Sequence, residues 1–143
     1  PGPTFIVSEL CGLSVELPSP HGLVRIGERD GARELVIPIG LSDADALAVG
    51  WNKLATARPL THELLSEVMA RLGGTLEAIR LIGRRAGVVL AELELSGPLG
   101  RHVLQCRPSD ALSLAVRQRL GPPIMVDERL FGPGDVEPHI AAL

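Results

Sequence analysis

The sequence is poor in aromatic side chains and carries little net charge. It has no tyrosine, one tryptophan and two phenylalanines. Proteins that bind single-stranded nucleic acid without sequence preference stack the bases on aromatic rings, so this scarcity argues against such a platform. The 14 basic and 17 acidic residues give a formal net charge of -3. A protein of this charge lacks a global positive field, and any site for a polyanion would have to be local.

The sequence also lacks the spacings of a metal-binding motif and the length of a membrane span. Cys11 and Cys106 are the only cysteines, and they are far apart; His21, His102 and His139 stand at no ligand spacing from them or from one another. No run approaches the roughly 20 apolar residues that cross a bilayer. The start "PGPTFIVSEL" has no signal-peptide pattern. We therefore expect a cytoplasmic protein without a membrane partner.

What is present indicates strands in runs with helices set between them. Two apolar segments, 23–28 and 33–39, flank Asp30-Gly31, a pair that favours a tight hairpin turn. A second pair of apolar segments flanks positions 84–86 in the same way. The predicted fold is therefore α+β, with a mixed β-sheet that stays open or closes into a barrel.

Three segments have the spacing of apolar residues that is typical of helices. They begin near positions 42, 61 and 109. A chain of 143 residues fits one domain. We expect that domain to span residues 4–131, followed by a Gly/Pro-rich C-terminal tail over residues 132–143.

Arg-Pro occurs twice, at 58–59 and at 107–108, each time directly before a predicted helix. Proline suits a helix entry because an amide there would lack a partner within the helix. Thr61 in the first segment, and Ser109 or Asp110 in the second, can cap the first-turn amides. These preferences explain the proline, threonine and serine. They do not explain why an arginine precedes both helices.

The two arginines allow a functional and a structural interpretation. A helix N-terminus offers unpaired amides and a partial positive charge, and an adjacent guanidinium adds a fork that matches phosphate oxygens. On this interpretation the phosphate-binding candidates are Arg58, Arg107, Thr61 and Ser109. In the alternative, the arginines form ion pairs that merely tie the helix starts together. The acidic partners available for such pairs are Asp45, Glu63 and Asp110.

His62, Asp110 and Asp45 are the candidate catalytic residues. An imidazole is the usual group for proton transfer near neutral pH, and the positive end of a helix favours its neutral, basic form. Asp45 and Asp110 could orient a water molecule or, if the fold brings them together, bind a divalent cation such as Mg²⁺. The sequence identifies no metal ligands. The structural alternative is that His62 is only a surface or capping residue.

Four motifs together resemble the bifunctional nuclease domain family: "IPIG", "RPLTHELL", "CRPSDALSLAVR" and "GPPIMVDERL". The resemblance covers about residues 4–131. It implies an α+β fold with a mixed sheet, self-association, and a nuclease activity on RNA and DNA. Asp45 stands where the family usually has glutamate. The positions that match the family are Pro38, Ala46, Arg58, Pro59, Thr61, His62, Glu63, Arg107, Pro108, Ser109 and Asp110.

The chain departs from the family in three places, which indicates a divergent member. Gly40 stands where the family has tryptophan, and Gln105 stands where it has an acidic residue. Its Asp-Gly and Phe-Tyr hairpin is replaced over positions 86–90 by residues that include Ala86 and Leu90. If the missing acid is a ligand or a base in the family, this chain has lost that activity or moved it to another residue.

Two hypotheses from different classes follow. The first is a nuclease of low sequence specificity that hydrolyses phosphodiester bonds in RNA or DNA. The second is a non-catalytic binding or assembly module, in which the Arg-Pro helix starts are structural or hold an anionic ligand. In both, nucleic acid is a candidate partner and a homo-oligomer is expected. The geometry that separates them is whether the charged ends converge on an open cleft or are buried in mutual pairs.

Overall fold

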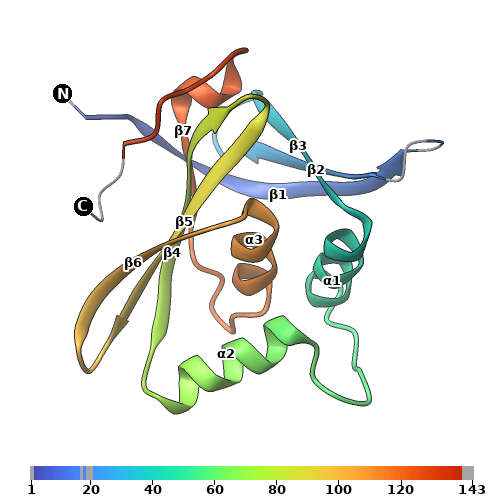
Figure 1. Cartoon of the computed structure of the whole chain (residues 1–143), viewed down its shortest axis with the longest axis vertical. Helices are drawn as coiled ribbons and strands as arrows, with labels where there is room; N and C mark the ends of the chain where they lie inside the picture. Colours follow the sequence, from blue (N-terminus) through green and yellow to red (C-terminus); the bar gives the residue numbers. More distant parts are fainter. Residues whose placement is uncertain (1, 17, 19–20, 140–143) are drawn as a thin grey trace.

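The computed structural model describes residues 2–16, 18 and 21–139. Within these residues the chain forms a seven-stranded sheet and three α-helices (Figure 1). The strands are β1 (Phe5–Glu16), β2 (His21–Glu28), β3 (Glu34–Gly40), β4 (Thr75–Arg85), β5 (Val88–Gly97), β6 (Gly100–Cys106) and β7 (Ile124–Asp127). The helices are α1 (Leu41–Trp51), α2 (Thr61–Arg71), α3 (Pro108–Val116) and the short 3-10 helix η1 (Glu128–Phe131).

The strands form one mixed sheet in the order β3-β2-β1-β7-β4-β5-β6. Its neighbours are antiparallel except for β4 and β7, which are parallel. The edges are β3 and β6, so the sheet is open and does not close into a barrel. The predicted single-domain α+β fold with a mixed sheet is therefore confirmed, and the choice between an open sheet and a barrel is decided.

Both predicted hairpins are present. The β2–β3 hairpin turns through Asp30 and Gly31, and the register pairs Gly27 with Glu34. Arg84 and Arg85, predicted to lie in the second turn, belong to β4, and the β4–β5 hairpin turns at Ala86 and Gly87, whose φ angles are 50° and 80°. Two successive positive φ values are what the tightest hairpin turn requires, because its backbone twist matches that of the strands.

Helix α3 lies inside the curve of the sheet and carries the centre of the core (Figure 1). Leu112 and Leu114 are buried against strand residues such as Ile79 and Leu81. Helix α1 packs against α3 and the β2–β3 hairpin. Helix α2 packs mainly against α3, and none of its residues is buried. The sheet and α3 are thus a rigid frame to which α2 is attached from outside.

The predicted side-chain caps at the helix starts were wrong. The N-cap residues are Gly40, Leu60 and Arg107, and none of them has a side chain that caps its helix. Thr61 is the first helical residue of α2 and Ser109 the second of α3, so both lie too far into the helix to cap it. The extended N-cap backbone alone directs the chain into each helix.

The end of the described chain packs onto the sheet. Val136 exchanges two backbone hydrogen bonds of 2.9 Å with Arg84 and is buried. The Arg84 guanidinium also donates to the carbonyls of Leu130, Gly132 and Gly134. The predicted domain end at residue 131 stays a prediction, and residues 140–143 of the predicted tail lie outside the described residues. No helix of the described part is long and apolar enough to cross a membrane.

Replacement of Gly83 by alanine tests this packing. A Cβ at Gly83 would lie 2.7 Å from the carbonyl oxygen of Val136 and 2.9 Å from Cβ of Pro138. We expect Gly83→Ala to lower the free energy of unfolding by about 1–3 kcal/mol, because the neighbouring backbone must shift. Gly121→Ala is the matched control, since nothing lies within 4 Å of its added Cβ. Equal stabilities of the two variants in urea would contradict the packing of residues 136–138.

Candidate active site

The starts of α2 and α3 and the first part of α1 surround an open cleft of about 490 Å³. Three polypeptide segments that are far apart in the sequence meet there because α3 is buried between the sheet and the other two helices. The ionisable residues that line the cleft are Asp43, Asp45, His62, Arg107 and Asp110. With three carboxylates and a single guanidinium, the lining is acidic rather than basic.

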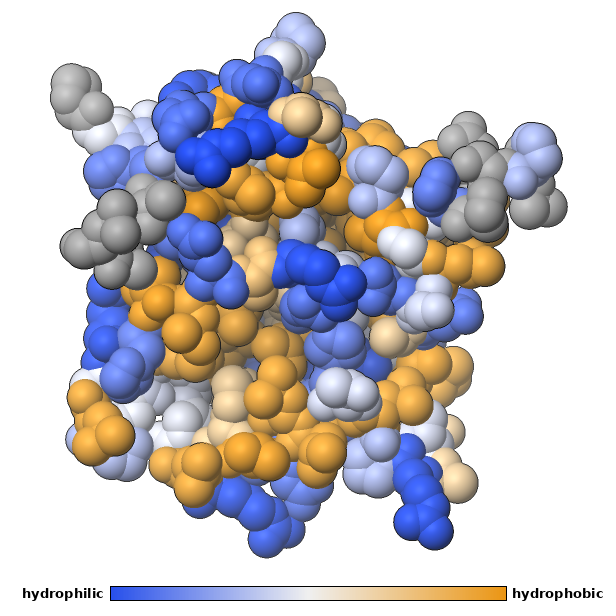
Figure 2. Space-filling model, viewed as in Figure 1, coloured by the Kyte–Doolittle hydropathy of each residue, from blue (hydrophilic) through white to orange (hydrophobic). Residues whose placement is uncertain are grey.

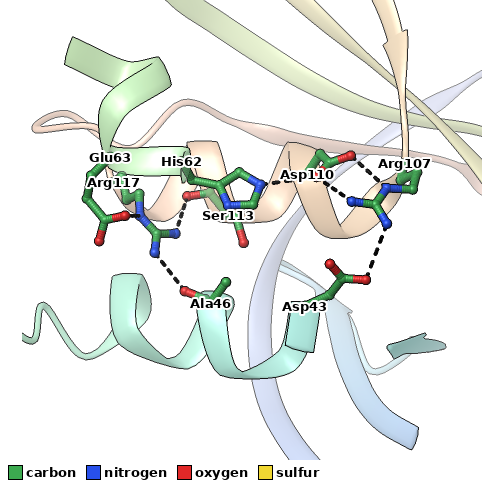
Figure 3. A network of polar contacts seen from close by, with 8 residues as sticks. All are labelled: Asp43, Ala46, His62, Glu63, Arg107, Asp110, Ser113 and Arg117. Carbon is green, nitrogen blue, oxygen red and sulfur yellow. Dashed lines mark hydrogen bonds and ion pairs between the residues drawn. The ribbon is translucent and has the colours of Figure 1, made fainter. Parts of the chain in front are cut away.

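Asp110 is the centre of a polar network that faces this cleft (Figure 3). Its Oδ1 lies 3.0 Å from Nε2 of His62. Arg107 donates hydrogen bonds to both carboxylate oxygens of Asp110, with Nε 2.9 Å from Oδ2 and Nη2 3.0 Å from Oδ1. Nη1 of Arg107 reaches Oδ2 of Asp43 on α1 at 3.4 Å. We call these four residues the cleft network.

The charge state of Asp110 fixes the tautomer of His62. Burial raises the pKa of the Asp110 carboxyl, but the hydrogen bonds from Arg107 and His62 outweigh it and hold the pKa below its usual range. The carboxylate is therefore ionised at neutral pH and can only accept hydrogen bonds. Nε2 of His62 must then carry the proton, and a neutral His62 ring keeps its free lone pair on Nδ1.

Arg117 is the centre of a second network, which also includes Ala46, Glu63 and Ser113 (Figure 3). Its side chain is 5% exposed. Nη2 donates to the carbonyl of Ala46 on α1 at 2.7 Å, and Nη1 donates to the carbonyl of Ser113 on α3 at 2.9 Å. Nε lies 3.0 Å from Oε2 of Glu63 on α2, an ion pair without the alignment of a hydrogen bond. This helix-joining network ties the three helices together.

The two networks show which arginines form ion pairs at the helix starts and which remain exposed. Arg107 does pair with Asp110, as the structural interpretation expected, yet its side chain remains 64% exposed at the cleft. Glu63 is also paired, but with Arg117 and not with either Arg-Pro arginine. The two arginines thus differ, because Arg107 is exposed at the cleft and Arg117 is buried, while His62, Asp110 and Glu63 are all partly buried.

The remaining candidates lie in different places. Thr61 and Asp45 line the cleft, and Asp45 is exposed. Ser109 is buried and lines a separate hollow on the other side of Arg107. Arg58 is exposed on the loop before α2 and is not among the residues that line the cleft. Their predicted roles stay predictions.

Sequence reasoning missed Asp43 and Arg117. Asp43 stands two positions before Asp45 in "SDAD", and the true start of α1 at Leu41 places it in the first turn. Correct placement of that helix start would have pointed to it. Arg117 follows the apolar segment of α3 and looks like an ordinary surface charge, so no pattern in the sequence indicates its burial.

The described residues offer only part of the set of ligands that a divalent cation needs. They contain no group of three or more His, Cys, Asp or Glu side chains placed to hold a metal ion. Asp43 and Asp45 offer hard oxygen ligands at the cleft, and Mg²⁺ is commonly bound by one or two carboxylates together with substrate phosphates. Any such ion would therefore need oxygens from the substrate.

Comparison with known proteins confirms the resemblance that the motifs indicated. The chain matches the bifunctional nuclease domain family over residues 24–137. Two curated relatives, both uncharacterised proteins from strains of Mycobacterium tuberculosis, are each 34% identical to it over 123 residues. These alignments cover 85% of this chain and 71% of each relative. The family match includes every residue of the cleft.

The two arginines at the ends of α3 give a matched pair of variants. Arg117→Ala leaves Glu63 and two carbonyls without their partner, and we expect it to lower the free energy of unfolding by about 3 kcal/mol. Arg107→Ala removes an exposed side chain, so we expect a loss of about 1 kcal/mol or less. Urea unfolding of both variants measures the difference. If Arg107→Ala were the more destabilising change, the assignment of Arg117 as the buried link between the helices would be wrong.

Proposed function

The chain belongs to the bifunctional nuclease domain family, and we propose that it hydrolyses phosphodiester bonds of RNA or DNA in the cleft at the starts of α2 and α3. The observation that carries the proposal is the hydrogen bond between His62 and Asp110 at an open cleft that also holds Arg107. An oriented imidazole beside a guanidinium supplies the two groups that phosphoryl transfer needs: a proton acceptor and a stabilising positive charge.

In this proposal His62 is the general base. Asp110 holds Nε2–H, so Nδ1 is the nitrogen that takes a proton from the attacking oxygen. That oxygen belongs to water for DNA, and to water or the ribose 2′-hydroxyl for RNA. As it bonds to phosphorus, the bond from phosphorus to the leaving oxygen breaks, and the leaving oxygen takes a proton from solvent. Asp110 also stabilises the imidazolium that forms, because the pair becomes an ion pair when the ring gains its proton.

Arg107 holds and polarises the phosphate. Asp110 occupies one edge of its guanidinium, and the 3.4 Å approach to Asp43 is the longest contact of the cleft network. A phosphate oxygen, as a stronger partner, displaces Asp43 and takes its place on Nη1. Thr61 and the free first-turn amides of α2 support the same anion from the opposite wall. Arg58, three residues earlier on the exposed loop, serves a neighbouring phosphate of the strand.

Asp45 is the remaining acidic group of the catalytic set. It is exposed at the cleft, where it can orient the attacking water or contribute one ligand to a cation that the substrate phosphate helps to hold. We expect activity to require an added divalent cation, because the three carboxylates of the cleft repel the phosphates of a nucleic acid unless a cation offsets their charge. Assays with Mg²⁺, and with a chelator in its place, measure that requirement directly.

Replacement of His62 tests the proposed chemistry. We expect His62→Ala to lower kcat for cleavage of a labelled RNA or DNA oligonucleotide by about 100-fold or more, the range that general acid–base groups contribute. His102→Ala is the matched control, because His102 is exposed on β6 and lines no part of the cleft. Circular dichroism confirms that both variants fold. Equal turnover by His62→Ala and the unmodified chain would mean that the cleavage does not arise at this site.

A second observation concerns self-association, which is expected under both candidate functions. Helix α2 exposes an apolar stripe made of Leu64, Leu65, Val68 and Leu72. Figure 2 shows apolar side chains along the lower edge of the molecule, where α2 lies in Figure 1. Apolar residues grouped in this way on one helix mark contact surfaces more often than scattered ones do. We infer that the stripe joins two copies of the chain into a homo-oligomer.

Charged substitutions in the stripe test this assembly. We expect Leu65→Glu and Leu72→Glu to dissociate the oligomer to monomers, as measured by light scattering after size-exclusion chromatography, because a charge cannot be buried without a partner. Val36→Glu is the control, since Val36 is also exposed but belongs to the edge strand β3, which lies in the upper part of Figure 1 whereas α2 lies at the bottom. An unmodified chain that is monomeric at high concentration would refute the stripe as a self-association surface.

A further inference from the structure

A second hollow lies on the other side of Arg107 from the cleft. Its cavity volume is about 250 Å³. It occupies the gap between the end of β3 and the β4–β5 turn, in front of the first residues of α3. The walls are mostly apolar, with Ile37, Ile39 and Val89 at its base and the exposed Val88 at its rim.

Arg107 and Asp43 line both the hollow and the cleft. They are therefore the partition between an apolar space and the space that holds His62 and Asp110. Asp43 is the one acidic residue of the hollow, and Arg107 lies 3.4 Å from it, so the mouth is not a strongly anionic surface. A molecule that spans the partition would place an apolar part in the hollow while an anionic part contacts the guanidinium.

The dimensions of the hollow restrict what fits. Sites that enclose drug-sized ligands have volumes of roughly 300–1,000 Å³, so a hollow of 250 Å³ takes a single ring system rather than a whole nucleotide. The described lining contains no aromatic residue, which means that aliphatic side chains, not stacked rings, would contact such a group. A heterocyclic ring joined to a phosphate through a sugar has the required combination of shape and charge.

We propose that the hollow is a subsite for one nucleobase of the substrate, next to the phosphate held by Arg107. This proposal rests on the proposed nuclease function and defines its substrate further. Because a base inside a duplex is stacked and paired, only an unpaired nucleotide can insert its base here. Single-stranded nucleic acid is therefore the preferred substrate, and Val88 together with the β4–β5 turn sets how readily a base enters.

The absence of side chains at Gly40 and Gly87 keeps the hollow open. Gly40 has φ -64° and ψ 153°, an extended conformation that any residue adopts. A Cβ there would lie 3.1 Å from Oδ2 of Asp43, so a large side chain at this position would extend across the mouth. Gly40→Trp is thus a substitution that fills the hollow without backbone strain.

Binding of two small probes separates the base from the phosphate. The probes are adenosine 5′-monophosphate and ribose 5-phosphate, which lacks the base, each titrated into ¹⁵N-labelled protein and followed by NMR. We expect the nucleotide to shift the amide signals of Gly40, Gly87 and Val89 and to bind about tenfold more tightly than the sugar phosphate. We expect Gly40→Trp to lower nucleotide affinity to that of the sugar phosphate. Gly121→Trp, at an open exposed glycine, leaves both affinities unchanged.

Val88→Asp is the second variant, because Val88 is 61% exposed and its replacement does not disturb the core. It places a charge in the wall and has the same expected effect as Gly40→Trp. Equal binding of the two probes, or unchanged nucleotide affinity in Val88→Asp, overturns the base subsite. These titrations involve no cleavage. If the chain cleaves nucleic acid through His62 but binds the two probes equally, the proposed function holds and the base subsite does not. If it binds the nucleotide more tightly but cleaves nothing, the subsite holds and the nuclease function does not.

Discussion

The guanidinium of Arg117 is the point at which the three helices meet, and the geometry of the cleft depends on it. It contacts α1 through the carbonyl of Ala46, α3 through Ser113 and α2 through Glu63. Helix α2 has no buried residue and packs mainly against α3. Its position is therefore set by this ion pair, by a hydrogen bond from Gln118 to Ser66, by the contact of His62 with Asp110, and by the packing of Met69 against the core. Glu63 is the immediate neighbour of His62, so the contact that anchors α2 also places the imidazole.

The two arginines of α3 differ because they stand at opposite ends of the helix dipole. Arg117 is the C-cap residue, where a positive charge is favourable and the last carbonyls need donors. Arg107 is the N-cap residue, where a positive charge is unfavourable. Asp110 compensates for it through two hydrogen bonds. The helix dipole accounts for the place of Arg117 at the end of α3, and its contacts with α1 and α2 account for its burial. The dipole does not account for the largely exposed side chain of Arg107, for which we propose a phosphate as the partner.

The local features of the fold could be predicted from the sequence, while the long-range ones could not. Asp30-Gly31 marks the β2–β3 hairpin because the turn residues and the flanking apolar segments act within a few positions. For the β4–β5 hairpin the flanking segments predicted a turn at 84–86, close to the turn at Ala86 and Gly87. The insertion of β7 between β1 and β4 depends on packing across the whole chain and leaves no local pattern. The helix starts were predicted within a residue or two. That small error was enough to assign caps to Thr61 and Ser109 and to overlook Asp43.

For the site, the sequence pointed to Arg107 and Asp110, three residues apart at one helix start. It could not show which groups each side chain contacts in the cleft. Asp110 orients two groups at once: Arg107 through both oxygens, and His62 through Oδ1. A single carboxylate therefore fixes the relative position of the proposed base and the proposed phosphate ligand before any substrate arrives, which reduces the entropy lost on binding. It also neutralises part of the charge of Arg107. The proposed site thus combines precise positioning with weak intrinsic attraction for a polyanion, and the proposed base subsite in the adjacent hollow would add binding energy that does not depend on charge.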